Sequence, residues 1–188
     1  NSMNCLAEAL GLALPGNGTV LATHSDRMKI FRRGAHLIAD LAERYYNDGD
    51  ETALPRSIAT REAFMNAMTI DMALGCSTNT MLHLPAIAHE AGVELNMDIA
   101  NEVSSRTPNL CHLAPAGRTY MEDLNEAGGV YAVMNELSKK NLLNLKCITV
   151  TGKTVGENIK DAVNLDPETI RPIDDPFMAT GGIAVLKG

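Results

Sequence analysis

The sequence predicts an α/β fold that is rich in helices. Apolar residues recur at three- and four-residue steps over several long stretches, which is the period of a helix. The β-branched or apolar runs between those stretches are only four or five residues long, as expected for short strands. Helices alternating with short strands are typical of an α/β domain. With 188 residues, of which 45% are hydrophobic and 21% charged, the chain is long enough for one domain with a single core.

The longest predicted helix lies in the first quarter of the chain. Ser25 or Asp26 can cap its start, and its apolar residues then recur at helical spacing with basic residues between them. The run of Asn, Asp and Gly at residues 47–50 is a stop signal. We therefore expect a single helix that ends within residues 47–50.

A second helix is expected from Arg61 to about Leu74, with Thr60 as its N-cap. Its residues are apolar nearly all round, so it should be buried on most sides. Asn66 and Asp71 lie inside this stretch. Because an unpaired polar side chain is costly to bury, each must find a partner in the interior or face a polar cavity.

The remaining predicted elements are shorter. Further helices are expected in the opening stretch and at residues 81–91, 98–105, 121–125, 130–139 and 155–162. Strands are expected at residues 19–23, 110–113, 147–150 and 183–186. The chain begins in the middle of a helical pattern and closes on a strand pattern. We therefore expect it to be an interior piece of a longer chain.

Composition excludes several classes of function. The formal net charge of −7 argues against a nucleic-acid partner, because binding phosphates needs a basic face. No apolar stretch approaches the roughly 18–20 residues that span a bilayer. The four cysteines, Cys5, Cys76, Cys111 and Cys147, are widely spaced and form no CxxC pair. We expect reduced, buried thiols in a reducing compartment rather than disulfides or a zinc site.

One short run of polar residues is the candidate site. Ser77, Thr78, Asn79 and Thr80 follow Gly75 at the predicted start of a helix. The free backbone amides at such a start favour an anion, such as a carboxylate or a phosphate. Simple capping by one of these hydroxyls explains the run equally well, although capping needs one such residue rather than four. Both interpretations stay open at this point.

Other groups of polar residues are expected to be structural. Residues 151–154, Thr-Gly-Lys-Thr, are similar to the end of a phosphate-binding loop, but that loop needs a glycine at the position of Cys147. We therefore expect a turn before a helix. Residues 23–27, which include His24, and residues 120–123, which include an adjacent Glu and Asp, are typical of surface and helix-start positions.

Several stretches, taken in order, resemble one enzyme family. They are NSMNCL at 1–6, EALG at 8–11, LPGNG at 14–18, ATHSDR at 22–27, ALPR at 53–56, GCSTNT at 75–80, LHL at 82–84, MED at 121–123, AGGV at 127–130 and GGIAVL at 181–186. The ordered set covers nearly the whole chain and resembles the dihydroxy-acid/phosphogluconate dehydratase family. Two positions depart from its pattern: Tyr120 stands where some members have His, and Cys76 where Gly is frequent.

The resemblance implies a part of an enzyme. Residues 1–188 would be part of a three-layer α/β/α N-terminal domain with short, mostly parallel strands, and the β-rich C-terminal domain would be absent. The parent would be a cytoplasmic homodimer that dehydrates a 2,3-dihydroxy-3-methyl acid to a 2-keto acid in valine and isoleucine synthesis. It would use an iron–sulfur cluster and Mg²⁺, which polarise the departing hydroxyl. A sugar-acid or 6-phosphogluconate dehydratase is the first alternative, and a stand-alone helical binding module the second.

The resemblance places the reacting groups outside this chain. The cluster cysteines and most Mg²⁺ ligands of the family would precede Asn1, and the last Mg²⁺ ligand and the serine base would follow residue 188. No catalytic residue, metal ligand or bound cofactor is therefore expected within the chain, which alone would be inactive. Asn1 and Ser2 are expected near the cluster without ligating it. Ser77, Thr78 and Asn79 are expected to form a wall of the substrate pocket.

Overall fold

A computed structural model of the chain describes residues 1–186. The ordered elements of this part are all helices, and they confirm the prediction of a helix-rich fold. Nine are α-helices and one, η1, is a short 3-10 helix. They are α1 (Ser2–Ala9), α2 (Asp26–Asp48), η1 (Glu51–Ala53), α3 (Pro55–Ile58), α4 (Arg61–Leu74), α5 (Thr78–Ala91), α6 (Asp98–Arg106), α7 (Met121–Glu126), α8 (Gly129–Ser138) and α9 (Val155–Ile159).

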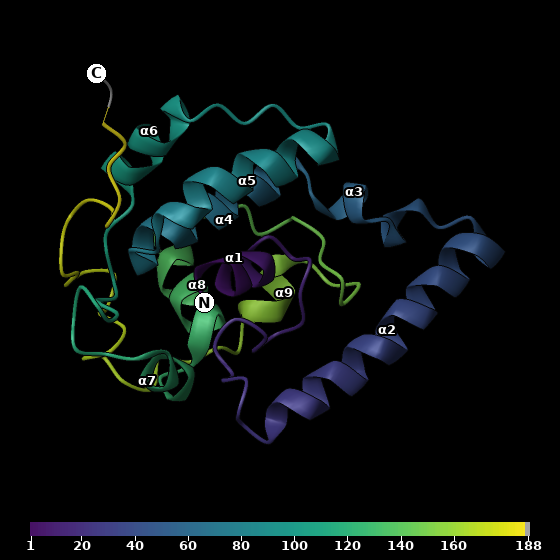
Figure 1. The fold of residues 1–188 in the computed structure, drawn as a ribbon, viewed down its shortest axis with the longest axis horizontal. Helices are drawn as coiled ribbons and strands as arrows, with labels where there is room; N and C mark the ends of the chain where they lie inside the picture. Colours follow the sequence, from purple (N-terminus) through teal and green to yellow (C-terminus); the bar gives the residue numbers. More distant parts are fainter. Residues whose placement is uncertain (187–188) are drawn as a thin grey trace.

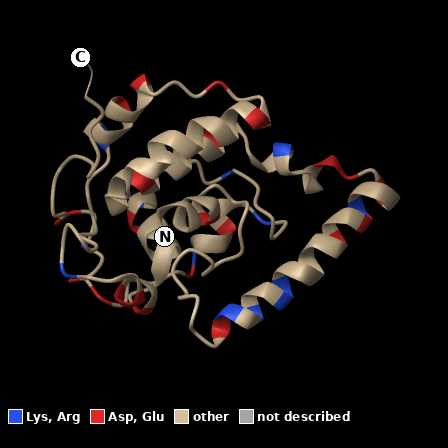
Figure 2. Ribbon diagram, viewed as in Figure 1, with Lys and Arg blue, Asp and Glu red and all other residues tan. Residues whose placement is uncertain are grey.

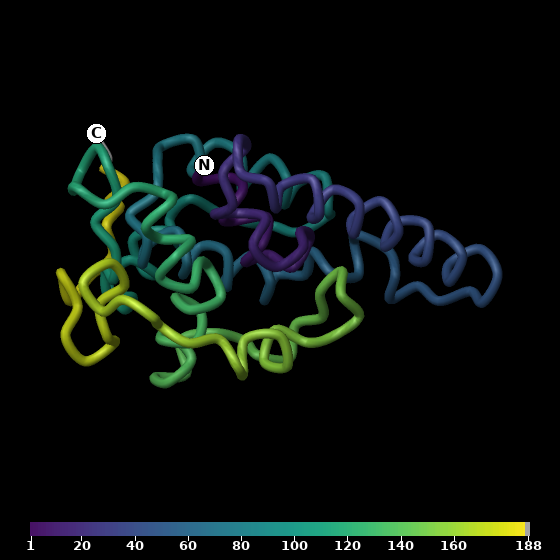
Figure 3. The backbone as a smooth tube through the Cα atoms, turned by 90° about the horizontal axis from the view of Figure 1, so that it is seen from below, coloured from purple at the N-terminus to yellow at the C-terminus, as the bar shows by residue number. Residues whose placement is uncertain are grey.

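The short helix α1 lies at the centre of the molecule (Figure 1). It contacts α4, α5 and α8, and its residues Cys5 and Leu6 have no exposed surface. The long helix α2 lies instead along the outer edge and extends to one end of the molecule (Figures 1 and 3). None of the helices in residues 1–186 is long and apolar enough to cross a membrane.

The two clearest helix predictions are confirmed. Helix α2 ends at Gly49, which adopts a left-handed conformation with φ 67° that glycine tolerates best. Helix α4 starts at the predicted residue, and the Thr60 hydroxyl accepts a hydrogen bond from the backbone N–H of Ala63. Eleven of its fourteen residues are buried, as its all-round apolar pattern predicts. The sequence did not predict η1 or α3, and α5 begins three residues before the predicted start at residue 81.

The four strand predictions are wrong for the described residues, which contain only isolated bridges. An extended segment becomes a strand when a neighbouring strand takes its backbone hydrogen bonds. Here other parts of the chain take them instead. In residues 147–150, the N–H groups of Thr149 and Val150 donate to the loop carbonyls of Lys153 and Gly11. The N–H groups of Leu110 and Cys111 donate to the Ala73 carbonyl at the end of α4. Val185 exchanges two hydrogen bonds with the side chain of Asn101 on α6, and residues 19–23 form turns.

A buried carboxylate holds the first loop against α1. Glu8 accepts hydrogen bonds from the backbone N–H groups of Gly16 at 2.9 Å and Gly18 at 2.7 Å. The loop approaches so closely that a Cβ on Gly18 would lie 2.7 Å from the Cα atom of Cys5. Burial raises the pKa of Glu8 to about 7, although the two amides and Arg27 act to lower it. The protonated acid is therefore favoured by folding.

The raised pKa of Glu8 predicts a pH-dependent stability. Between its ordinary pKa of 4.5 and about 7, the folded protein binds more protons than the unfolded chain. The free energy of unfolding therefore falls as the pH rises through this range. Glu8→Gln should remove up to about 3 kcal/mol of that fall. A separate fall remains, because burial also raises the pKa of Asp71, as described below. Urea unfolding at pH 5 and pH 7.5 measures the difference, with the exposed Glu102→Gln as the control. If the free energy of unfolding changed equally between pH 5 and pH 7.5 in Glu8→Gln and in the unmodified protein, the raised pKa of Glu8 would be contradicted.

Candidate functional site

A pocket of about 390 Å³ lies where the start of α1 meets the start of α5. Three segments form it: the first residues of the chain, the turn between α4 and α5, and the loop before α7. The lining residues are Asn1, Ser2, Cys5, Leu74, Gly75, Cys76, Ser77, Thr78, Leu113, Ala114, Pro115, Ala116 and Met121. Four of the five residues singled out from the sequence, Asn1, Ser2, Ser77 and Thr78, therefore lie around one cavity. Asn79 is exposed and does not line it.

The hydroxyl groups of Ser77 and Thr80, at the start of α5, have different surroundings. Ser77 is the N-cap residue by backbone position, with φ −109° and ψ 163°, but its side chain makes no capping hydrogen bond. Thr80 faces the interior, and its Oγ1 lies 2.8 Å from Asp71 Oδ2 and 2.7 Å from the Ser77 carbonyl oxygen. Because Ser77 does not cap the helix, its hydroxyl and the first amides of α5 remain available at the pocket wall.

Asp71 is the buried carboxyl group beneath this wall. It has no exposed surface, and its Oδ1 has no hydrogen-bond partner within the described residues. Burial raises its pKa to about 7, while the side chains of Thr80 and Cys76 act to lower it. Burial, then the neighbouring Asp71 and Cys5, raise the pKa of the Cys76 thiol. The pocket wall thus carries the Cys76 thiol, which stays protonated, and behind it lies the buried Asp71 carboxyl group with a pKa of about 7.

Comparison with known proteins identifies the family. Residues 1–158 match the family described as dihydroxy-acid/6-phosphogluconate dehydratase, N-terminal. The chain belongs to this family. Its whole length is 63% identical to dihydroxy-acid dehydratase of Lachnoclostridium phytofermentans and 62% identical to that of Clostridium beijerinckii. It covers 32% and 33% of those proteins, so it spans about a third of the length of the relatives it matches.

The family assignment confirms the resemblance drawn from the ordered motifs. Carboxydothermus hydrogenoformans has a more distant relative of the same name, 55% identical over all 188 residues. That match extends through residues 159–188, which lie beyond the region of the family description. The aligned region therefore includes the segments that form the pocket and those that surround them.

The thiols of this dehydratase-family chain do not fit a metal centre. All four cysteines are free, and Cys5 and Cys111 are buried. Burial raises the pKa of Cys5 to about 12, and burial also raises the pKa of Cys111 and Cys147. A protonated thiol is a poor ligand, because metals bind the thiolate. Within residues 1–186, no three His, Cys, Asp or Glu side chains are grouped so that they could hold a metal ion. We therefore assign no reaction step to a metal on these residues.

The remaining polar groups have the structural roles predicted for them. Thr154 and Glu157 form a reciprocal capping box at the start of α9, so the Thr-Gly-Lys-Thr run is a helix start. Asp123 accepts a hydrogen bond from the Tyr120 backbone N–H at 2.7 Å and caps α7. His24 Nδ1 accepts one from the Asp26 N–H at the start of α2.

Sequence reasoning missed one wall of the pocket. This wall is formed by Ala114, Pro115 and Ala116, and it carries no polar residue that would single it out. The need of Asp71 for a polar partner was predicted, because a carboxylate in a helix that is apolar nearly all round must face such a partner or a cavity. Thr80 is that partner.

The Asp71–Thr80 contact predicts a large effect of a small substitution. Thr80→Val keeps the shape of the side chain but leaves the buried carboxyl without its hydrogen bond from the hydroxyl. The free energy of unfolding should fall by about 1–3 kcal/mol, and the pKa of Asp71 should rise further. Chemical denaturation measures the first effect. Thr78→Val, on the exposed side of the same helix start, is the matched control, and an equal loss in both variants would contradict the contact.

Proposed function

We propose that residues 1–188 are an interior piece of the N-terminal, cluster-side domain of a dihydroxy-acid dehydratase. The parent enzyme would remove water from a 2,3-dihydroxy-3-methyl acid to give the 2-keto acid in valine and isoleucine synthesis. The observation that carries this proposal is the match of all 188 residues of this chain, at 55–63% identity, to relatives named dihydroxy-acid dehydratase. The aligned region spans the pocket segments as well as the core.

The pocket supports a role in binding an acid substrate. The first amides of α5 and the Ser77 and Thr78 hydroxyls lie at one wall, where the positive end of the helix dipole attracts a carboxylate. Asn1 and Ser2 lie on another wall of the same cavity. We therefore assign Ser77 and Thr78 to the substrate carboxylate, and Asn1 and Ser2 to the side nearest the cluster. Asn79 would stand outside the cavity, beside its rim.

The chemistry itself would come from the rest of the protein. An iron–sulfur cluster and Mg²⁺ held there would act on the departing hydroxyl, and a base there would remove the proton beside the carboxylate. The same remainder would supply the strands and further helices of a three-layer α/β/α domain. The parent would be a homodimer in the cytoplasm, and this chain alone would be inactive.

A 6-phosphogluconate dehydratase is the second candidate, because the matching family description covers both activities. Assaying the full-length protein with 2,3-dihydroxy-3-methylbutanoate and with 6-phosphogluconate separates the two candidates. We expect turnover of the branched dihydroxy acid. Turnover of only the sugar acid would overturn the preferred substrate and leave the family assignment intact.

The pocket assignment predicts the effect of removing one hydroxyl. Ser77→Ala in the full-length protein should lower kcat/KM about tenfold, mainly through KM, because one hydrogen bond to the substrate carboxylate is lost. Protein stability should change little, since the Ser77 side chain caps nothing. Steady-state kinetics measures this effect, with Ser105→Ala on the exposed surface of α6 as the control. Unchanged kinetics for Ser77→Ala would contradict a role at the substrate.

A further inference from the structure

Helix α2 carries two apolar stripes, and only one of them packs against the rest of the chain. The inner stripe includes the buried residues Ile30 and Leu41, with Gly34 and Leu37 half-buried between them. The outer stripe consists of the four residues that directly follow the inner ones in the sequence, and of one more residue at each end, three positions further along the helix. Its members are Met28, Phe31, Ala35, Ile38, Ala42 and Tyr45. One residue further along a helix is about 100° further round it, so the outer stripe lies to one side of the face that packs on the core.

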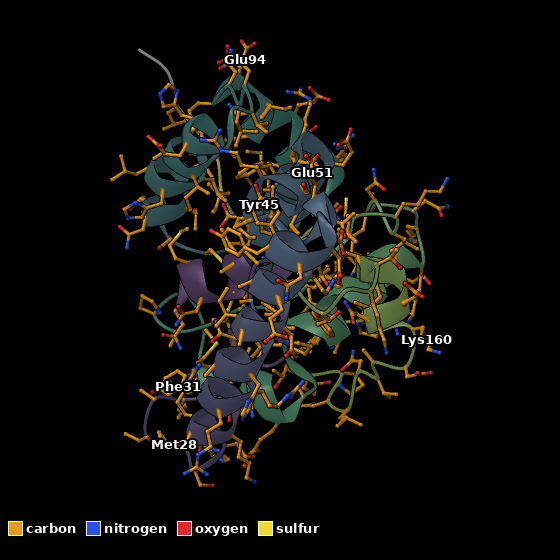
Figure 4. The ribbon with its side chains drawn as sticks, turned by 90° about the vertical axis from the view of Figure 1, so that its right-hand side faces the viewer. Met28, Phe31, Tyr45, Glu51, Glu94 and Lys160 are labelled. Carbon is orange, nitrogen blue, oxygen red and sulfur yellow. The ribbon has the colours of Figure 1, made fainter. Side chains whose placement is uncertain are left out.

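The outer stripe is exposed along its whole length. The exposed fractions are 55% for Met28, 55% for Phe31, 65% for Ile38 and 37% for Tyr45. Met28, Phe31 and Tyr45 lie along the same side of α2 (Figure 4). Scattered apolar residues on a surface need no explanation, but a continuous row on a peripheral helix marks an interaction surface.

The spacing of this row is that of a helix-pairing seam. The six residues follow one another at steps of three, four, three, four and three, which is the seven-residue repeat of paired helices. Large and small side chains also alternate in a definite order. From its N-terminal end the row reads Met, Phe, Ala, Ile, Ala, Tyr. When the row is reversed, each large residue between the two ends stands opposite an alanine. One half of the row therefore complements the other half.

Charge is distributed unequally between the two halves of α2. The first half holds four basic residues, Arg27, Lys29, Arg32 and Arg33, and one acidic residue, Asp26. The second half holds three acidic residues, Asp40, Glu43 and Asp48, and one basic residue, Arg44. Figure 2 shows Lys and Arg gathered toward the N-terminal half. The ion pairs of α2 within the described residues join Asp26 to Lys29 and to His24, and Arg44 to Asp50. Arg32, Arg33, Asp40 and Glu43 are left without an ion pair in this part of the chain.

We propose that α2 of one chain packs antiparallel against α2 of a second copy through this outer stripe, about a two-fold axis between residues 36 and 37. This axis sets Met28 opposite Tyr45 of the second copy, Phe31 opposite Ala42, and Ala35 opposite Ile38. Every large residue outside the end layers then meets an alanine, so the backbones approach closely without a clash. The same axis sets the basic half of each helix against the acidic half of the other.

The occupant is a second copy because the row is complementary to itself. A two-fold axis makes each surface meet an identical one, and a surface used in this way must match its own reverse. An unrelated segment of the parent protein would not require α2 to be complementary to itself in both size and charge. Phe31 and Ile38 also border an apolar groove of about 350 Å³ between α2 and residues 12–17, which gives the second helix room beside the core. This inference rests on the proposed homodimer and names its surface.

Cross-linking the full-length protein tests the pairing directly. In Phe31→Cys/Ala42→Cys, the two thiols of one chain are about 16 Å apart along α2, too far for a short bis-maleimide to join. The proposed axis instead brings Cys at 31 of one chain next to Cys at 42 of the other. We expect a covalent dimer joined 31-to-42. His36→Cys/Asn47→Cys, with the same spacing on exposed positions off the stripe, is the matched control and should form at least tenfold less dimer.

A second variant tests the same surface without new thiols. Ile38→Asp places a charge within the stripe, whereas His36→Asp places it two residues away on the same exposed helix. Sedimentation should give a dimer dissociation constant at least tenfold higher for Ile38→Asp than for His36→Asp. Equal constants, equal cross-linking of the two cysteine pairs, or a link from residue 31 or 42 to another segment of the same chain would overturn the proposal. Turnover of the unmodified protein is measured separately, so failure of the proposed activity is distinguishable from failure of the pairing.

Discussion

The contact between Glu8 and the first loop positions the rest of the structure. Two backbone N–H groups, of Gly16 and Gly18, converge on one buried carboxylate, and this draws the loop onto α1. Helix α1 is thereby enclosed at the centre, between α4, α5 and α8. Its first residues, Asn1 and Ser2, then reach the start of α5 and complete the pocket.

Local signals in the sequence were enough to predict most of the helices, although not the short η1 and α3. Gly49 ends α2 and Thr60 begins α4 because each acts through its own backbone conformation or side chain, without help from distant residues. The strand predictions were wrong because a strand depends on a distant partner. Residues 110–113 are extended, but whether they form a strand depends on a partner, and the end of α4 takes their hydrogen bonds. No local pattern reports that choice.

The candidate site was only partly predictable for the same reason. The polar run at residues 77–80 indicated a helix start with spare hydroxyls, and the structure assigns Thr80 to Asp71 while Ser77 stays at the pocket. That division depends on α4 and α5 meeting at Gly75, which the sequence could not specify. The outer stripe of α2 is a related case. Phe31 and Ile38 share the apolar spacing of Ile30 and Leu37, but because each lies one position further along the helix, both are exposed.

The central claim is that the cavity between the starts of α1 and α5 holds the acid group of the substrate. A crystal structure of the full-length protein with a bound dihydroxy acid tests this most directly. The account predicts the ligand carboxylate within hydrogen-bond distance of the Ser77 hydroxyl or the first amides of α5, with Asn1 and Ser2 on another wall of the same cavity. A ligand that touches none of these residues would contradict it.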